Sequence, residues 1–189
     1  MTQPPRRRLP RFWLRAAQQE SGSAAVEFAL IAPVILLILA VTFEIGLTLR
    51  ARSGLIGAIS ATSHQTLASA ATVDDGTAQT VATALVGGLA GRGRSATVNL
   101  NNAVTARLEG GTIVVTDTGT TVENCYCPTR GEAGYDWNAS MACNTDCADG
   151  SLAGRFVQIT AQAPFTSILG AYSFFSPETL QNSAVVRLP

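Results

Sequence analysis

The sequence predicts an α+β fold, in which a long N-terminal transmembrane helix leads into a head with a small antiparallel sheet and a disulfide-stapled loop. Three observations lead to this prediction. An apolar run near the N-terminus is long enough to cross a bilayer, short alternating segments separated by turn residues fill much of the second half, and four cysteines lie close together in a loop rich in Gly, Asp and Asn.

The apolar run extends over residues 28–43, sixteen residues without a charge, and continues after Glu44 as far as Leu49. A helix over residues 28–49 would be ~33 Å long, which is enough for a hydrocarbon core of ~30 Å. Pro33 lies near the start of this helix and removes one backbone donor, which membrane helices tolerate. The run therefore predicts one membrane-spanning helix.

Charge predicts how this helix is oriented. All thirteen cations are arginines; five of them precede the apolar run within the first fifteen residues, and Arg50 and Arg52 follow it. The excess before the helix places the N-terminus in the cytoplasm and the residues after Arg52 in the periplasm. A secretory signal peptide has a similar layout, but its apolar region is shorter, and no small-x-small cleavage site closely follows this run.

Beyond the membrane, helical spacing continues to about residue 71, with Leu55, Ile56, Ile59, Ser63 and Leu67 near one face together with Ala70 or Ala71. Gly54 and Gly57 weaken this extension. Asp74 and Asp75 then interrupt the pattern, and either can cap a second helix that runs through Leu89. The glycines at positions 87, 88, 91 and 93 predict a loose linker.

The strand signals come after that linker. They cover residues 96–100, 104–108, 112–116, 156–163 and 180–188. Glu109, Gly110 and Gly111 form a plausible hairpin turn between the second and third of these segments. The last segment alternates well, which puts Leu180, Asn182, Ala184, Val186 and Leu188 on one side.

The residues just before the apolar run form a pattern of their own. Gly22 is followed by small or apolar residues, then by Glu27 and the aromatic Phe28. A carboxylate at the edge of a membrane helix is unfavourable unless it has a partner or a role. The simpler alternative is an interfacial acid that suits the positive end of the helix dipole.

With a short basic leader in front, this pattern resembles the processing site of type IVb prepilins. The string from Ser23 to Gly46, SAAVEFALIAPVILLILAVTFEIG, is similar to the N-terminus of TadE-like pseudopilins of the tight-adherence (Flp) pilus system. The resemblance is strongest over residues 20–60, fair over 155–189 and weak between them. It implies a pilin-like head and cleavage between Gly22 and Ser23 by a membrane aspartic prepilin peptidase, which makes Glu27 the fifth residue of the product.

The resulting domain organisation has three parts. Residues 1–22 are a basic cytoplasmic leader that is removed, residues 23–72 are the transmembrane helix with its periplasmic extension, and residues 73–189 are the periplasmic α+β head with a cysteine loop at 123–150. Removal of the leader leaves eight arginines and twelve acids, a net charge of −4. Such a product has no electrostatic reason to bind nucleic acid.

After cleavage, the new α-ammonium group would lie one helical turn from the Glu27 carboxylate, or Glu27 would reach the terminus of a neighbouring subunit. An ion pair in a low-dielectric setting is stronger than in water and can set the stagger between subunits. Glu44 lies seventeen residues further on and does not share a face with Glu27. An interfacial acid and an assembly contact both remain possible for Glu44.

The four cysteines, Cys125, Cys127, Cys143 and Cys147, lie on the side assigned to the oxidising periplasm, so two disulfides are expected. A bond between Cys125 and Cys127 would close a very small ring, which favours cross-pairing in either the nested or the crossed arrangement. A four-thiolate zinc site is the alternative, but the C-x-C and C-x3-C spacings are not those of zinc knuckles. Tyr126, Tyr135 and Trp137 in the same loop are expected to pack.

The composition offers little for catalysis, since the chain has one histidine, His64, and no lysine. We therefore expect no enzyme activity, no metal and no cofactor. The leading hypothesis is a minor pilin or pilus-assembly protein of the bacterial inner membrane that acts in pilus biogenesis and adherence. Its expected partners are the prepilin peptidase, other pilins and pilus-assembly membrane proteins, and the lipid bilayer. The alternative is an unprocessed bitopic membrane protein with a periplasmic protein-binding head.

Overall fold

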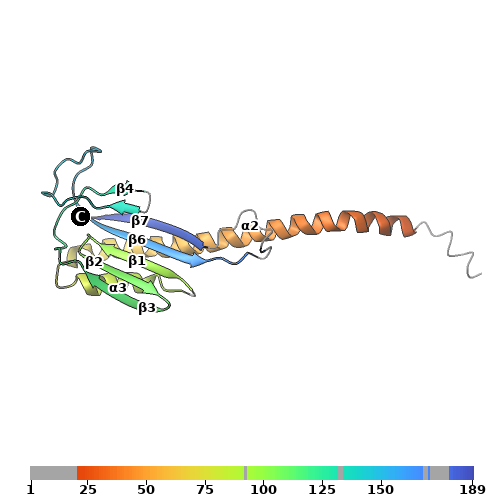
Figure 1. The fold of residues 1–189 in the computed structure, drawn as a ribbon, viewed down its shortest axis with the longest axis horizontal. Coiled ribbons are helices and arrows are strands. Elements are labelled where there is room, and N and C mark those ends of the chain that lie inside the picture. Colours follow the sequence, from red (N-terminus) through yellow and green to blue (C-terminus); the bar gives the residue numbers. More distant parts are fainter. Residues whose placement is uncertain (1–20, 92, 132–133, 168–169, 171–178) are drawn as a thin grey trace, which may run out of the picture. The chain divides into compact units, whose positions relative to one another are not determined.

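A computed structural model describes residues 21–91, 93–131, 134–167, 170 and 179–189 of the chain (Figure 1). The chain divides into two units, Met1–Ile45 and Gly46–Pro189. The predicted leader lies outside the described residues, apart from its last two positions. The predicted architecture is confirmed: a long apolar N-terminal helix is followed by a small antiparallel sheet and a head with two disulfides.

The described part of the first unit belongs to helix α2, which spans Ser21–Ser69 and continues into the second unit. Helical structure persists through Pro33. Large apolar side chains are exposed all along this part, from Val26 to Phe43. The hydroxyl of Thr42 donates to the carbonyl of Ile38 over 2.8 Å, which satisfies it within the apolar helix. By length and composition, α2 is the one helix among the described residues that can cross a membrane.

In the second unit, the remainder of α2 buries a stripe against the head. The buried positions are Leu55, Ile59, Thr62, Thr66 and Ala70. The predicted stripe was wrong at Ile56 and Leu67, whose side chains are about half exposed. Thr66 can take a buried position because its hydroxyl donates to the carbonyl of Thr62 over 2.9 Å. Among the described residues, no fully buried side-chain N or O atom lacks a hydrogen-bond partner.

A short 3-10 helix, η2 (Ala70–Thr72), ends this stretch, and α3 (Ala78–Gly88) follows. Helix α3 buries Ala78, Ala82, Leu85 and Val86. The predicted glycine linker is too long at its start, since Gly87 and Gly88 belong to α3. Gly88 lies beside α2, where an added Cβ would be 3.7 Å from the Thr62 hydroxyl oxygen. Small residues at this position allow the two helices to approach closely.

The main sheet has five strands, all antiparallel, in the order β3-β2-β1-β6-β7 (Figure 1). Each lies within one residue of its predicted bounds: β1 Ser95–Leu100, β2 Val104–Glu109, β3 Thr112–Asp117, β6 Arg155–Pro164 and β7 Thr179–Leu188. Two further strands in the cysteine loop, β4 (Thr129–Gly131) and β5 (Gly134–Asp136), form a separate ribbon that the sequence did not predict.

One face of the sheet forms the core with both helices. Val98 of β1, Ala106 of β2 and Ile159 of β6 are fully buried there, in the same cluster as Leu55 of α2 and Leu85 of α3. The opposite face is polar. It carries pairs such as Asn99 with Thr105 and Gln162 with Gln181, whose side chains are hydrogen-bonded. This alternation is the period-2 pattern of a sheet with one buried face.

The hairpin turns explain why the strands hold this register. Gly110 and Gly111 both have positive φ, 57° and 85°, and join Glu109 to its partner Thr112 in a two-residue turn, as the sequence predicted. In the β1–β2 turn, Asn101 and Asn102 have φ of 49° and 57°. Asparagine tolerates this left-handed conformation better than most residues do.

Candidate functional site

The predicted processing site lies in the first two turns of α2. Gly22, Ser23, Glu27 and Phe28 are all helical and exposed, and the Phe28 side chain is 69% exposed. A Cβ added at Gly22 would meet nothing within 4 Å. The Ser23 hydroxyl donates to Oε1 of Glu27 over 3.3 Å, so these two residues share a face one turn apart. The cleavage itself remains a prediction.

Glu44 differs from Glu27 in its surroundings. Its side chain is only 5% exposed, whereas Phe43 before it is 67% exposed and Ile45 after it is 47% exposed. Glu44 also has an interaction partner. Burial separates Glu44 from its exposed neighbours on α2, and both roles considered for it, an interfacial acid and an assembly contact, stay predictions.

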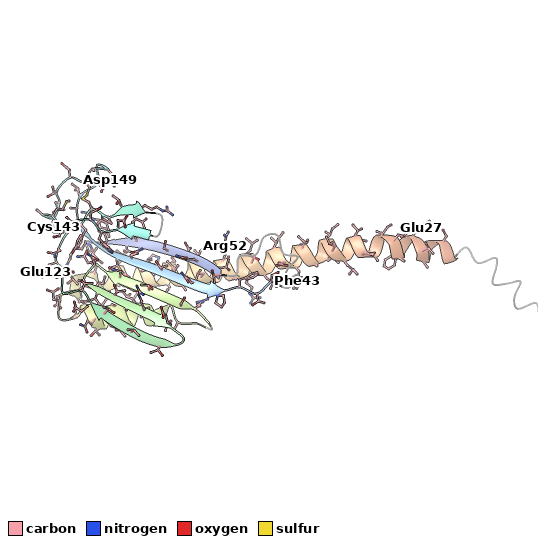
Figure 2. The ribbon with its side chains drawn as sticks, viewed as in Figure 1. Glu27, Phe43, Arg52, Glu123, Cys143 and Asp149 are labelled. Carbon is pink, nitrogen blue, oxygen red and sulfur yellow. A yellow bond between two sulfur atoms is a disulfide. The ribbon has the colours of Figure 1, made fainter. Side chains whose placement is uncertain are left out.

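The cysteine loop contains two disulfides, Cys125–Cys143 and Cys127–Cys147. The pairing is the crossed one of the two arrangements that the sequence left open, with Cα atoms 5.0 and 5.7 Å apart respectively. The alternative four-thiolate zinc site is wrong for this structure, because all four sulfurs are used in disulfides. In Figure 2, the labels of Cys143, Glu123 and Asp149 all lie at the end of the head that carries the cysteine loop.

Aromatic packing and backbone bridges fix the loop to the head. Tyr126 is buried and meets Trp137 edge to face, with ring centroids 5.7 Å apart. The backbone of Tyr126 exchanges two hydrogen bonds with Gly154, just before β6. The expectation that Tyr126 and Trp137 pack is therefore confirmed; Tyr135 is half-buried.

A residue that sequence reasoning missed holds this region together. Asn101 is fully buried, and its Nδ2 donates to the carbonyls of Val122 and Asn124 over 2.7 and 2.6 Å. Its Oδ1 accepts the N–H of Phe156 over 3.0 Å. Asn101 thereby ties the β1–β2 turn to the entrance of the cysteine loop and to the start of β6. The signal that could have found it is an Asn-Asn pair between two predicted strands, over residues 96–100 and 104–108.

The two aspartates before α3 have separate tasks. Asp74 closes the turn that leads into α3: its Oδ1 accepts the N–H of Thr77 over 2.8 Å, and the Thr77 hydroxyl oxygen accepts the N–H of Asp74 over 3.0 Å. This reciprocal pair lies in the turn before α3, whose N-cap is Thr77 without a side-chain cap hydrogen bond, so the predicted aspartate cap is not confirmed. Asp75 instead accepts the hydroxyl of Thr121 and the N–H of Val122, and so fixes the segment that leads to Cys125.

Two exposed carboxylates have shifted acidities. The hydroxyl and then the N–H of Thr77 lower the pKa of Asp74 below its ordinary value of 3.8. The hydroxyl and the N–H of Ser151 likewise lower the pKa of Asp149, at the tip of the cysteine loop. In both cases the hydrogen bonds favour the charged form. These shifts belong to two tight turns, one before α3 and one in the cysteine loop.

The described residues offer little for cofactor chemistry. No group of three or more His, Cys, Asp or Glu side chains within them is arranged to hold a metal ion. His64 is exposed on α2. The described residues instead provide an exposed apolar helix segment and a head cross-linked by two disulfides.

Comparison with known proteins gives one match. The family model described as TadE-like protein matches residues 22–64, so it begins at Gly22 and covers the apolar part of α2 and part of the stripe that packs on the head. No curated protein and no solved structure matches the chain. The resemblance proposed from the sequence is confirmed over this segment: residues 22–64 are a TadE-like segment, consistent with a TadE-like pilin of Tad pilus systems.

Proposed function

We propose that this protein is a minor pilin or pilus-assembly protein of a Tad/Flp-type (type IVb) pilus, which a prepilin peptidase cuts between Gly22 and Ser23. It acts in pilus biogenesis and adherence and is not an enzyme. The observation that carries the proposal is that the TadE-like match begins at Gly22, where a basic leader ends and α2 begins.

The geometry of the helix start supports cleavage at this point. Gly22 is exposed, and no described side chain approaches the position of its missing Cβ. A peptidase pocket can therefore reach the peptide bond from that side. Cleavage would release the leader with its five arginines and would create a positive charge at Ser23.

The contact between Ser23 and Glu27 supports the role of the carboxylate in assembly. Because these side chains already meet at 3.3 Å, an α-ammonium on Ser23 would lie within one turn of Glu27. In a bundle of helices, the same carboxylate can pair with the terminus of a neighbour. The low dielectric of the membrane strengthens such a pair, so it would fix the axial stagger between subunits.

The exposed apolar side chains of α2 support membrane insertion and helix packing. Leu30, Leu36 and Leu37 are 73%, 65% and 65% exposed. A surface of this kind requires lipid or other helices around it. Five arginines before the helix against two after it support a cytoplasmic N-terminus and a periplasmic head in a single-pass protein of the bacterial inner membrane.

The direct test is the N-terminus of the protein isolated from cells that contain the prepilin peptidase. Mass spectrometry should find a chain that begins at Ser23. A chain intact from Met1 would overturn the proposal in favour of an unprocessed bitopic protein with a protein-binding head.

A matched pair of variants separates recognition from folding. Gly22→Val should abolish processing, whereas Gly46→Val should leave it intact. Added Cβ atoms at both glycines meet nothing within 4 Å, so neither variant disturbs packing within the described chain. Equal processing of both variants would exclude Gly22 as the recognised residue.

The carboxylate has its own test. Glu27→Gln should keep membrane insertion and α2 intact but reduce pilus assembly, because the amide cannot form an ion pair. The control Ser23→Ala removes only the hydroxyl that donates to Glu27 and should assemble normally. Normal pilus assembly by Glu27→Gln would show that the negative charge at this position is not needed for assembly.

A further inference from the structure

We propose that three arginines at the helix-proximal end of the head bind the anionic phosphate headgroups of the membrane that α2 crosses. These proximal arginines are Arg50 and Arg52 of α2 and Arg94 of the α3–β1 loop. The inference rests on the membrane-spanning role proposed for α2.

The first observation is where Arg50 and Arg52 stand on α2. The apolar stretch ends at Leu49, and both arginines directly follow it with exposed side chains. Successive helical residues turn by ~100°, so residues two apart point to nearly opposite sides of the helix. These two cations therefore flank α2 on both sides, just where a hydrocarbon core would give way to headgroups.

The second observation is that the fold brings Arg94 to the same level. Its Nη2 is 3.7 Å from the position that a Cβ would occupy at Gly54. Gly54 lies four residues after Arg50, so the Arg94 guanidinium stands on the same face, one turn (~6 Å) further along. A headgroup layer is ~5–7 Å thick on each side of the core, which accommodates all three side chains.

The backbone of the loop makes this placement possible. Gly93 has a φ of 66° and lies against Pro164, where an added Cβ would be 3.1 Å from the Pro164 Cγ. A side chain at position 93 would strain the backbone and crowd the Pro164 ring. Gly91 lies under the Arg94 side chain, since its Cβ would be 2.8 Å from the Arg94 Cδ. The two glycines let Arg94 lie along α2.

The third observation is the charge around this cluster. Within the described part of the chain, none of the proximal arginines forms an ion pair or a hydrogen bond through its side chain. Glu109, in the β2–β3 turn beside the start of β1, is the acid at this end of the sheet. The other described acids of the second unit lie in or near the cysteine loop and the start of α3: Asp74, Asp75, Asp117, Glu123, Asp136, Asp146 and Asp149.

Figure 2 shows this separation within the head, with Arg52 at the opposite end from Glu123 and Asp149. Cations directly after a membrane helix attract phosphate groups of anionic lipid. A negatively charged distal end is repelled by the same surface. The charge distribution therefore favours one end of the head at the bilayer. Arg92, in the same loop, lies outside the described residues and is not needed for the inference.

The test is segment-resolved hydrogen exchange of the full chain in nanodiscs. One set of nanodiscs contains phosphatidylglycerol and the other contains only phosphatidylcholine. Amides of residues 89–95 should exchange several-fold more slowly in phosphatidylglycerol, because each arginine near an anionic surface strengthens binding about fivefold. Raising the salt concentration should remove the difference, since it screens the attraction.

Variants make the result specific. Arg94→Gln and, independently, Arg50→Gln should each lose most of the lipid-dependent protection. The matched control Arg130→Gln, an exposed arginine of β4 in the cysteine loop, should keep it. Unchanged exchange in the strands β1 and β6 verifies that each variant is folded.

Two results would overturn the inference. Equal protection of residues 89–95 in both lipids would exclude headgroup binding. Protection that appears in phosphatidylcholine when inorganic phosphate is added would also exclude it, because it would indicate a site for the free anion. Incorporation of the chain into nanodiscs is measured separately, and pilus assembly plays no part in the assay. A failure of this inference is therefore distinguishable from a failure of the proposed function.

Discussion

Replacing Asn101 by alanine removes three buried hydrogen bonds at once. The carbonyls of Val122 and Asn124 lose their donor, and the N–H of Phe156 loses its acceptor. At about 1 kcal/mol for each bond, this loss amounts to about 3 kcal/mol. Alanine must also adopt the φ of 49° found at this position, which adds about 1–2 kcal/mol. We expect Asn101→Ala to lower the free energy of unfolding by about 4–5 kcal/mol.

Two control variants separate these contributions. Asn101→Gly removes the hydrogen bonds but not the favourable backbone conformation, so it should be about 1 kcal/mol less destabilising than Asn101→Ala. Asn102→Ala changes a neighbour with nearly the same backbone, φ of 57°, whose side chain forms no hydrogen bond within the described chain. Asn102→Ala should therefore lower the free energy of unfolding only by the backbone strain of alanine at positive φ, about 1–2 kcal/mol.

The assay is urea denaturation of the full chain in detergent micelles with disulfides intact. The chain has two tryptophans, so a Trp13→Phe background leaves Trp137, which packs on Tyr126 beside the affected segment, as the fluorescent reporter. The reasoning would be refuted if Asn101→Ala lowered the free energy of unfolding by less than about 1.5 kcal/mol, or if Asn101→Ala and Asn102→Ala lowered it equally. Either result would mean that the backbone of the turn, and not the buried amide, stabilises this region.

Three further changes are predicted from the head. Because the hydrogen bonds from Thr77 lower the pKa of Asp74 below 3.8, the stability that these bonds contribute to the turn before α3 is complete above that pH and is lost as the pH falls through the folded-state value. The denaturation midpoint of the wild type minus that of Asp74→Asn should therefore become smaller as the pH is lowered from about 6 to about 3. A difference that stays constant over this range would contradict the prediction. Removing the Cys127–Cys147 bridge by a double serine variant should cost about 3 kcal/mol in denaturation and leave no free thiol, whereas thiol labelling of Cys143 would contradict the crossed pairing. Ile159→Ala, at a fully buried position of β6, should cost about 3 kcal/mol in the same assay, and a loss under about 1 kcal/mol would mean that this part of the core is loosely packed.

The strands were predicted within one residue because their signals are local. β7 alternates as expected, with Leu180 and Leu188 buried and Asn182, Ala184 and Val186 half-buried on the same face. The Gly110-Gly111 turn has the two positive φ values that a two-residue hairpin needs. Such patterns are set by neighbours in sequence, so they can be recognised without the fold.

The stripe of α2 shows where local reasoning ends. Hydrophobicity alone selected Leu67, which is 50% exposed, over Thr66, which is 1% exposed. A threonine becomes acceptable in the core because its hydroxyl bonds to the preceding turn of its own helix. The position of the head decides which face is covered, and that position depends on residues far along the chain.

The same division holds for the candidate sites. The Gly22–Glu27–Phe28 pattern was read from adjacent residues, and the TadE-like match begins at the same glycine. The crossed disulfides, the amide of Asn101 and the approach of Arg94 to Gly54 each join residues at least eighteen positions apart.

By itself, the sequence determined the apolar helix, the strands and their turns, and the segment that resembles TadE-like proteins, because hydropathy, turn chemistry and short motifs act over a few residues. Only the tertiary structure decided the disulfide pairing, the buried face of α2, the burial of Glu44 and the separation of arginines from acids within the head. Those features depend on how the chain packs on itself, which brings together residues that no local pattern relates.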